Sequence, residues 1–281
     1  LTFGGDYTNH RHSPLTQIDQ SNVSRLAPAW SVEVGSQGKL ETTPIVWNGV
    51  LYGTSTFSIV YAIDARTGAL KWRWDPALVK GGIADGAARF CCGPVNRGVA
   101  IYKGKVYVGL LDGRLVALDA ETGHVAWSVQ TTPVGKDYSI TGAPRIVKGK
   151  VVIGNGGGEY GVRGYLTAYD AETGKQAWRW FVVPGDPSKG LEDRSMEMAL
   201  KSWKGQWFKY GGGGTPWDGI AYDPEANLVY VGTGNGSPWA DRTLGARPSR
   251  TGTTRQARRF RRAFIRWTPW SLTLFRSCTS S

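Results

Sequence analysis

The chain has 281 residues, enough for a large hydrophobic core, and its 39 glycines and 13 tryptophans are typical of a turn-rich β-protein. No run of 18 apolar residues occurs, so the sequence predicts no transmembrane segment. The net charge of +12 would suggest a nucleic-acid-binding protein, but residues 241–281 hold ten arginines against one acid, Asp241. They account for +9 of the charge and leave about +3 for the other 240 residues, which predicts no nucleic-acid partner.

The N-terminal segment, residues 1–30, is polar and predicts a solvated loop. A strand is expected at residues 30–34, where Trp and two Val alternate with polar side chains. The first repeat unit is expected to begin directly afterwards, at Glu41-Thr42-Thr43-Pro44.

A stretch of eleven residues occurs three times and predicts the architecture. It runs from Ala62 to Trp72, from Ala117 to Trp127 and from Ala168 to Trp178, so the copies begin 55 and 51 residues apart. Each copy contains D-A-x-T-G, in which Asp can accept hydrogen bonds from the backbone that follows and Gly supplies the positive φ of a turn. The Trp that closes each copy is expected to fill the gap between neighbouring sheets.

A second turn signal precedes each copy. Asn48-Gly49, Lys103-Gly104 and Lys148-Gly149 each lie between apolar strands and predict hairpins. Four short strands per unit, repeated at this period, indicate an all-β fold, a β-propeller built of four-stranded blades. Residues 41–239 are expected to form about four of these blades.

Two adjacent cysteines, Cys91 and Cys92, lie between the first two repeats, and the third cysteine is Cys278. One interpretation is a pair of reduced, buried thiols. The other is a disulfide between the two neighbours, which would make a small, rigid, apolar surface and would require an oxidising compartment. The sequence by itself leaves both open.

Two further stretches interrupt the repeats. Residues 154–164 are rich in glycine and contain Glu159, but no Lys-Ser/Thr and no helix follow, so they make a poor phosphate loop. Glycines at a strand end also let a flat ligand approach the backbone, although an ordinary loop is the simpler interpretation. Residues 184–214 are the longest interruption and therefore a candidate functional loop.

The repeat pattern stops after Asp241, and residues 241–281 contain no D-A-x-T-G. Arginines interleaved with aromatic residues would fit an RNA- or membrane-binding arm. The alternative is that these residues are an out-of-frame translation of the next blade. Sequence rich in Arg, Ser, Thr and Pro is common in shifted reading frames of GC-rich DNA. We favour the second interpretation. Residues 1–240 are thus expected to form a partial propeller, and residues 241–281 a basic non-blade tail that is out of frame or disordered.

These features together resemble the quinoprotein alcohol dehydrogenases of the methanol and ethanol dehydrogenase family. That family consists of periplasmic eight-bladed propellers that use pyrroloquinoline quinone (PQQ) and a bound calcium or lanthanide ion. The D-A-x-T-G-x-x-x-W units resemble its tryptophan docking motifs, and Asp6-Tyr7-Thr8-Asn9 resembles the start of the mature enzymes. The resemblance covers residues 1 to about 240. It implies about half of the ring, the N-terminal part of an enzyme that oxidises primary alcohols to aldehydes by hydride transfer to PQQ.

The resemblance also implies roles for individual residues. Cys91 and Cys92 match a disulfide that covers one face of the quinone, and Trp217 matches the indole that stacks on the other face. Positions that bond the cofactor's carboxylates and carbonyls are matched by Glu41, Arg97, Thr141, Gly157, Gly158 and Thr215. Glu159 and Asn235 match two metal ligands, and oxygen donors are what Ca²⁺ takes.

The family's catalytic base is an aspartate that lies beyond the metal-binding asparagine, and no Asp or Glu follows Asp241 in this chain. The resemblance therefore implies that the chain lacks the base and is inactive alone. The partners it implies for the intact enzyme are a small alcohol substrate and a cytochrome c-type electron acceptor, in the periplasm.

Two other functions stay open at this point. A non-enzymatic propeller scaffold of the outer-membrane assembly type would explain the Trp repeats, but not the cysteine pair together with Glu159, Trp217 and Asn235. A sugar-oxidising quinoprotein is a third possibility, although the cysteine pair favours the alcohol branch. Stoichiometric binding of PQQ and metal would distinguish an enzyme from a scaffold.

Overall fold

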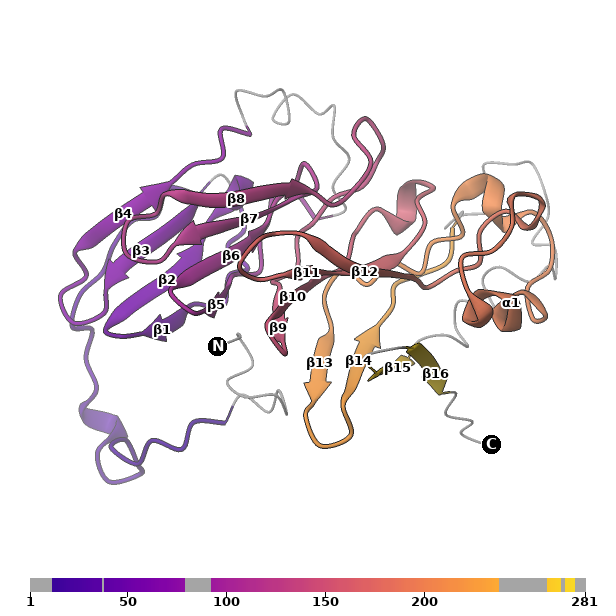
Figure 1. The fold of residues 1–281 in the computed structure, drawn as a ribbon. Helices are drawn as coiled ribbons and strands as arrows, with labels where there is room; N and C mark the ends of the chain where they lie inside the picture. Colours follow the sequence, from indigo (N-terminus) through magenta and orange to yellow (C-terminus); the bar gives the residue numbers. More distant parts are fainter. Residues whose placement is uncertain (1–11, 37, 79–91, 238–261, 269–270, 276–281) are drawn as a thin grey trace.

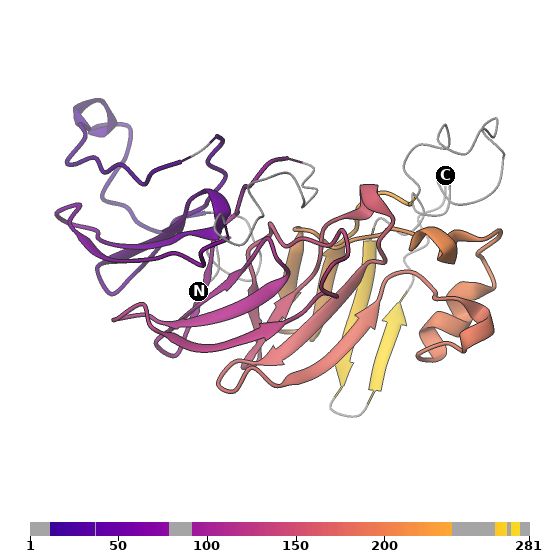
Figure 2. The same ribbon diagram turned by 90° about the horizontal axis from the view of Figure 1, so that it is seen from above.

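The computed structural model describes residues 12–36, 38–78, 92–237, 262–268 and 271–275, the last two ranges for their backbone. These residues form four antiparallel sheets of four strands each, which follow one another in chain order (Figures 1 and 2). The predicted all-β fold of four-stranded blades is confirmed. Within the described ranges no helix is long and apolar enough to cross a membrane.

In each sheet, neighbouring strands are paired in the order in which the chain makes them. The first sheet consists of β1 (Ile45–Trp47), β2 (Val50–Thr54), β3 (Val60–Asp64) and β4 (Leu70–Trp74). The second consists of β5 (Ala100–Tyr102), β6 (Lys105–Gly109), β7 (Arg114–Asp119) and β8 (Val125–Gln130). The third consists of β9 (Arg145–Val147), β10 (Lys150–Ile153), β11 (Tyr165–Asp170) and β12 (Gln176–Phe181). The fourth consists of β13 (Ile220–Asp223), β14 (Leu228–Gly232), β15 (Arg262–Thr268) and β16 (Ser271–Phe275). Strand β9 contacts both β5 and β13, so the first strands of successive sheets lie side by side.

Both predicted turn types are present. At the three hairpins both turn residues have positive φ, for example 48° at Asn48 and 72° at Gly49, as a type I′ turn requires. In the first D-A-x-T-G unit, Asp64 Oδ1 accepts hydrogen bonds from the backbone N–H of Arg66 and Thr67 and from the Thr67 hydroxyl. Asp119 and Asp170 make the same three contacts in their units, and hydrogen bonds from Thr to these exposed carboxyls lower their pKa.

The repeat tryptophans join one sheet to the next. The Trp72 indole lies on Gly123 of the following unit and donates its N–H to the Ala120 carbonyl at 3.0 Å. Trp127 does the same to Ala171, also at 3.0 Å. Trp30, which precedes the first sheet, donates to the Ala65 carbonyl at 3.1 Å. The predicted gap-filling role of the tryptophans is therefore confirmed.

A tyrosine reinforces two of these contacts. The Tyr52 hydroxyl donates to the same Ala120 carbonyl as Trp72, and the Tyr107 hydroxyl donates to the same Ala171 carbonyl as Trp127. Burial raises the pKa of Tyr52 and of Tyr107 above the ordinary tyrosine value, so both hydroxyls remain donors into the alkaline range. One carbonyl thus receives two hydrogen bonds from the preceding sheet.

Three segments differ from the sequence expectations. Residues 30–34 are not a strand, although Trp30 docks as a repeat tryptophan would. Within residues 184–214, where a loop was expected, the structure forms the short helices η5 (Pro187–Lys189), α1 (Arg194–Leu200) and η6 (Trp207–Tyr210). Other short helices in the described ranges are η1 (Val23–Arg25), η2 (Thr56–Ser58) and η4 (Gly158–Tyr160).

Helix α1 forms because Asp193 caps it, with Oδ1 accepting from the backbone N–H of Ser195 and Met196. Met196, Trp203 and Trp207 are buried in one core cluster with Trp180 of the third sheet and residues of the fourth. This segment is therefore part of the packed core of the third and fourth sheets.

The third difference concerns the basic segment after Asp241. Strands β15 and β16 lie within it: β15 pairs with β14, and β16 pairs with β15, although no blade strands were expected in this segment. Apolar residues spaced along 263–267 and 272–275 supply a strand-compatible pattern without any repeat motif. The domain boundary near residue 240 stays a prediction, because residues 238–261 lie outside the described ranges.

Replacing Gly123 with alanine should destabilise the chain much more than replacing Gly104. Both have left-handed φ, 75° and 71°, so each alanine costs ~1–2 kcal/mol in backbone strain. A Cβ at Gly123 would also lie 2.8 Å from Trp72 Cδ2, whereas one at Gly104 meets nothing within 4 Å. The clash should add ~1–3 kcal/mol. Urea denaturation of the two variants measures the difference, and equal losses would contradict the docking role of Trp72.

Candidate functional site

One pocket of about 220 Å³ lies among loops that belong to the second, third and fourth sheets. Its described lining combines an aromatic ring, a cysteine, one cation, one carboxylate and several hydroxyl, amide and glycine positions. The lining residues are Cys92, Arg97, Ser139, Thr141, Gly156, Gly157, Glu159, Thr215, Trp217 and Asn235.

The repeat architecture gathers these residues at one place. Glu41, Arg97, Thr141 and Trp217 each lie three or four residues before the first strand of a sheet: β1, β5, β9 and β13. Backbone hydrogen bonds connect these segments in turn, from Thr43 N to Arg97 O at 3.2 Å and from Arg97 N to Thr141 O at 2.9 Å. The pocket is therefore lined by equivalent positions of successive blades.

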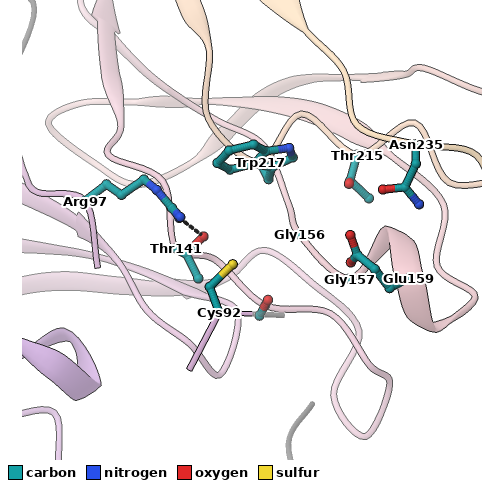
Figure 3. A pocket seen from close by; sticks show the side chains of 10 residues that line it. Cys92, Arg97, Thr141, Gly156, Gly157, Glu159, Thr215, Trp217 and Asn235 are labelled. Atoms are coloured by element: carbon teal, nitrogen blue, oxygen red, sulfur yellow. Dashed lines mark hydrogen bonds between the residues drawn. The ribbon is translucent and has the colours of Figure 1, made fainter. Parts of the chain in front are cut away.

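Trp217 forms one wall of the pocket. Its side chain is half-exposed, at 45%, and in Figure 3 its ring lies across the pocket from Cys92. The backbone that carries it sits tightly on the third sheet: a Cβ at Gly142 would lie 2.2 Å from Trp217 O, and one at Gly154 would lie 1.9 Å from Pro216 O. Only glycine at these two positions allows so close an approach.

The opposite wall is held by a strained turn of the first sheet. Phe57 and Ser58 both have φ near 59°, a conformation uncommon for residues other than glycine. The Phe57 N–H donates to the Pro94 carbonyl at 2.8 Å. Asn96, itself buried, donates through Nδ2 to Ser58 Oγ and to the Gly109 carbonyl. The segment that carries Cys92 and Arg97 is thus fixed from two sides.

Arg97 is the cationic group of the pocket lining. Its guanidinium forms an ion pair with Glu41 at 2.7 Å. It also donates to the Thr141 hydroxyl at 2.6 Å, the contact drawn as a dashed line in Figure 3. Its central carbon also lies 4.8 Å from the centroid of the Trp217 ring, within cation–π range. Three neighbours therefore fix the guanidinium, which presents donors for an anionic or carbonyl oxygen.

Oxygen-bearing side chains occupy the other end of the pocket. Figure 3 places Glu159, from η4, beside Thr215 and Asn235, with Arg97 and Thr141 on the far side. A Cβ at Gly158 would lie 3.0 Å from Thr215 Oγ1 and 3.7 Å from the Asn235 carbonyl, so these three segments pack closely. Among the described residues no group of three or more His, Cys, Asp and Glu gathers as a metal site.

The structure brings most of the candidate residues together. Cys92, Arg97, Thr141, Gly157, Glu159, Thr215, Trp217 and Asn235 line the pocket, Glu41 contacts it through Arg97, and Gly158 lies directly behind it. Cys91 lies outside the described ranges, so its disulfide with Cys92 stays a prediction.

Two lining residues, Ser139 and Gly156, were missed. They face each other in an antiparallel bridge in which Gly156 N donates to Ser139 O at 2.7 Å. A signal was available for both: Ser139 lies two residues before Thr141, and Gly156 precedes two of the assigned glycines.

The arrangement suits a flat, anionic ligand. A ring between Trp217 and Cys92 would be bound by its faces, leaving its edge to Arg97 at one end and to Glu159 and Asn235 at the other. A carboxylate and an amide oxygen are ligands that hard cations such as Ca²⁺ take, although two donors need further oxygens from the ligand or from water. PQQ with a metal ion fits these residues.

Comparison with known proteins agrees with this geometry. Residues 1–252 match the family described as the β-propeller domain of PQQ glucose/ethanol/alcohol dehydrogenases. The chain is 56% identical over 240 residues to the quinohemoprotein alcohol dehydrogenase ADH IIB of Pseudomonas putida, covering 85% of this chain and 34% of that protein. It thus spans about a third of the length of such curated relatives.

Solved structures agree as well. The crystal structure of the quinohemoprotein alcohol dehydrogenase from Comamonas testosteroni superposes with a TM-score of 0.86 at 46% identity, covering 98% of this chain and 40% of that one. A europium-containing methanol dehydrogenase gives a TM-score of 0.73 at 38% identity, covering 84% and 42%. The predicted resemblance is confirmed, and the chain belongs to the PQQ-dependent glucose/ethanol/alcohol dehydrogenase β-propeller family.

Proposed function

We propose that this chain forms the cofactor-binding part of a periplasmic quinoprotein alcohol dehydrogenase. The observation that carries the proposal is the pocket in which Trp217 lies opposite Cys92, with Arg97 at one end and Glu159 and Asn235 at the other. High identity to quinohemoprotein alcohol dehydrogenases over most of the chain supports it.

The chain's own residues would bind and orient the cofactor. Trp217 and the Cys91–Cys92 pair would enclose the ring, and Arg97, held by Glu41 and Thr141, would neutralise its anionic edge. Glu159 and Asn235 would hold a calcium or lanthanide ion. When bound, PQQ supplies an electron-poor quinone carbonyl that accepts hydride, and the ion polarises that carbonyl.

The proposed substrate is a primary alcohol, oxidised to the aldehyde, and the proposed electron acceptor is a c-type cytochrome. One relative at 46% identity is a 1-butanol dehydrogenase (cytochrome c) of Thauera butanivorans. A periplasmic location would allow adjacent cysteines to stay oxidised. Glu159 is the one carboxylate in the described pocket lining, and once committed to the metal it cannot also take the alcohol's proton.

Trp217→Ala should weaken PQQ binding by about tenfold or more, because stacking on an aromatic side chain is worth ~1–3 kcal/mol. Trp217→Phe, which keeps a ring face, should lose less. Tyr210→Ala removes a similarly exposed aromatic side chain outside the described lining and serves as control. Equilibrium dialysis of the full chain with PQQ and Ca²⁺ measures the three constants. Equal affinities for Trp217→Ala and Tyr210→Ala would contradict the stacking role.

Glu159→Gln should abolish the strengthening of PQQ binding by Ca²⁺ or Eu³⁺, because a neutral amide attracts a hard cation far less than a carboxylate does. PQQ affinity is measured with each ion and after removal of the ion by EDTA. Glu172→Gln is the matched control, since this carboxylate is exposed and pairs with Lys105. A metal effect that survives in Glu159→Gln would show that the ion binds elsewhere.

The 281-residue chain by itself should show no alcohol-dependent dye reduction, even with added PQQ and Ca²⁺ or La³⁺. A missing general base alone would cost ~10²–10⁴-fold. A homologous chain that continues through further blades provides the positive control. Metal-dependent oxidation of ethanol by this chain would show that one of its own residues acts as the base.

A further inference from the structure

An ion pair between buried Arg145 and half-buried Asp218 lies beside the backbone that carries Trp217. Asp218 follows Trp217 in the chain, and its Oδ1 is buried and accepts no hydrogen bond from the described residues. The Nη2 of Arg145 lies 3.6 Å from it, and the Arg145 side chain is only 5% exposed. Neither residue belongs to the described pocket lining.

Arg145 ties two sheets together at this point. It is the first residue of β9, and its Nη1 donates to the carbonyls of Ala143 and Pro144 at 2.7 and 3.2 Å. Its Nε donates across to the carbonyl of Ile220, the first residue of β13, at 2.9 Å. Asp218 and Ile220 lie at the two ends of the short segment that follows Trp217, and Arg145 contacts both. The Arg145 guanidinium therefore holds this segment at both ends.

Stability alone is a poor reason for charges at this place. Removing two charges from water costs several kcal/mol, and well-packed apolar residues often serve the fold as well as a buried ion pair does. What Arg145 adds is direction, because its guanidinium donates to backbone carbonyls of both sheets at fixed angles, and the charge of Asp218 attracts it to this place. The Trp217 ring is half-exposed, so its own packing does not fix its plane. To stack on a flat ligand, the ring must turn its face toward the pocket, and a fixed backbone holds it in that orientation.

We propose that Arg145 and Asp218 are positioning residues for Trp217: they fix the backbone that carries the indole, and so the plane of the ring against the bound cofactor. The proposal rests on the proposed function for the identity of the ligand. The orientation of Trp217 can be observed without any ligand, which makes the two proposals separable.

The test uses the full chain labelled with 5-fluorotryptophan and follows the ¹⁹F resonance of Trp217, assigned by its loss in Trp217→Phe. Two variants weaken the pair in different ways: Asp218→Asn is isosteric and removes the charge, and Arg145→Lys keeps the charge but loses the fork. Arg179→Lys is the matched control. Arg179 also joins a strand to a loop, through Thr167 Oγ1 and the Thr131 carbonyl, but it does not contact the Trp217 segment.

In Asp218→Asn and Arg145→Lys, the Trp217 resonance should shift or broaden more than those of the other tryptophans, and the PQQ dissociation constant should rise about tenfold. In Arg179→Lys both should stay as in the parent chain. If the pair variants lower the urea midpoint while the Trp217 resonance stays unchanged, the pair is structural only and the proposal is wrong. If the resonance responds but the parent chain does not bind PQQ, the positioning role stands and the proposed function fails.

Discussion

The fold depends on one inter-sheet contact, an indole laid on a glycine turn with its N–H bonded to a carbonyl of that turn. Trp30, Trp72 and Trp127 each make it. It links positions that are far apart in the sequence: Trp72 and Ala120 are separated by 48 residues. Because the Asp side chain and the glycine fix the turn through local contacts, the position of the acceptor carbonyl does not depend on the neighbouring sheet. A turn fixed by adjacent residues thus determines how two sheets far apart in the sequence pack together.

The pocket is a by-product of the same repetition. Each blade begins with an extended segment that enters its first strand, and the first three of these segments are joined in turn by backbone hydrogen bonds. In one blade the position carries Glu41, in the next Arg97, then Thr141 and then Trp217. A fold built from equivalent units therefore supplies four different chemical groups at four equivalent points, and each can vary without disturbing the blade that carries it.

Sequence reading succeeded where conformation is determined by a few adjacent residues. The D-A-x-T-G units and the Asn-Gly and Lys-Gly hairpins specify their own backbone, so their strands could be placed. It failed where tertiary contacts decide. Trp30 docks from a segment without ladder hydrogen bonds. Helix α1 lies in a stretch read as a loop, because its apolar face is completed by Trp180 of the third sheet and by residues of the fourth. Arg145 was overlooked because its partners, Asp218 and Ile220, are more than seventy residues away. The site residues could be placed through a resemblance, and no composition or spacing would have assigned their roles.

The contact between the third and fourth sheets differs from the two before it. Where the first and second sheets offer Tyr52 and Tyr107, the third has Val152, and the buried Trp178 Nε1 finds no acceptor among the described residues. Within the described part of the chain, the tryptophan contact at this boundary therefore lacks the hydrogen bonds made at the two before it, and packing of the core shared by the third and fourth sheets takes their place. Thr141, Gly157 and Glu159 belong to one side of it, and Thr215, Trp217 and Asn235 to the other. A ligand that contacts both sides binds only when the third and fourth sheets are packed together. Its binding therefore stabilises the folded chain by mass action. Occupancy of the pocket and cohesion of these two blades are thus thermodynamically coupled.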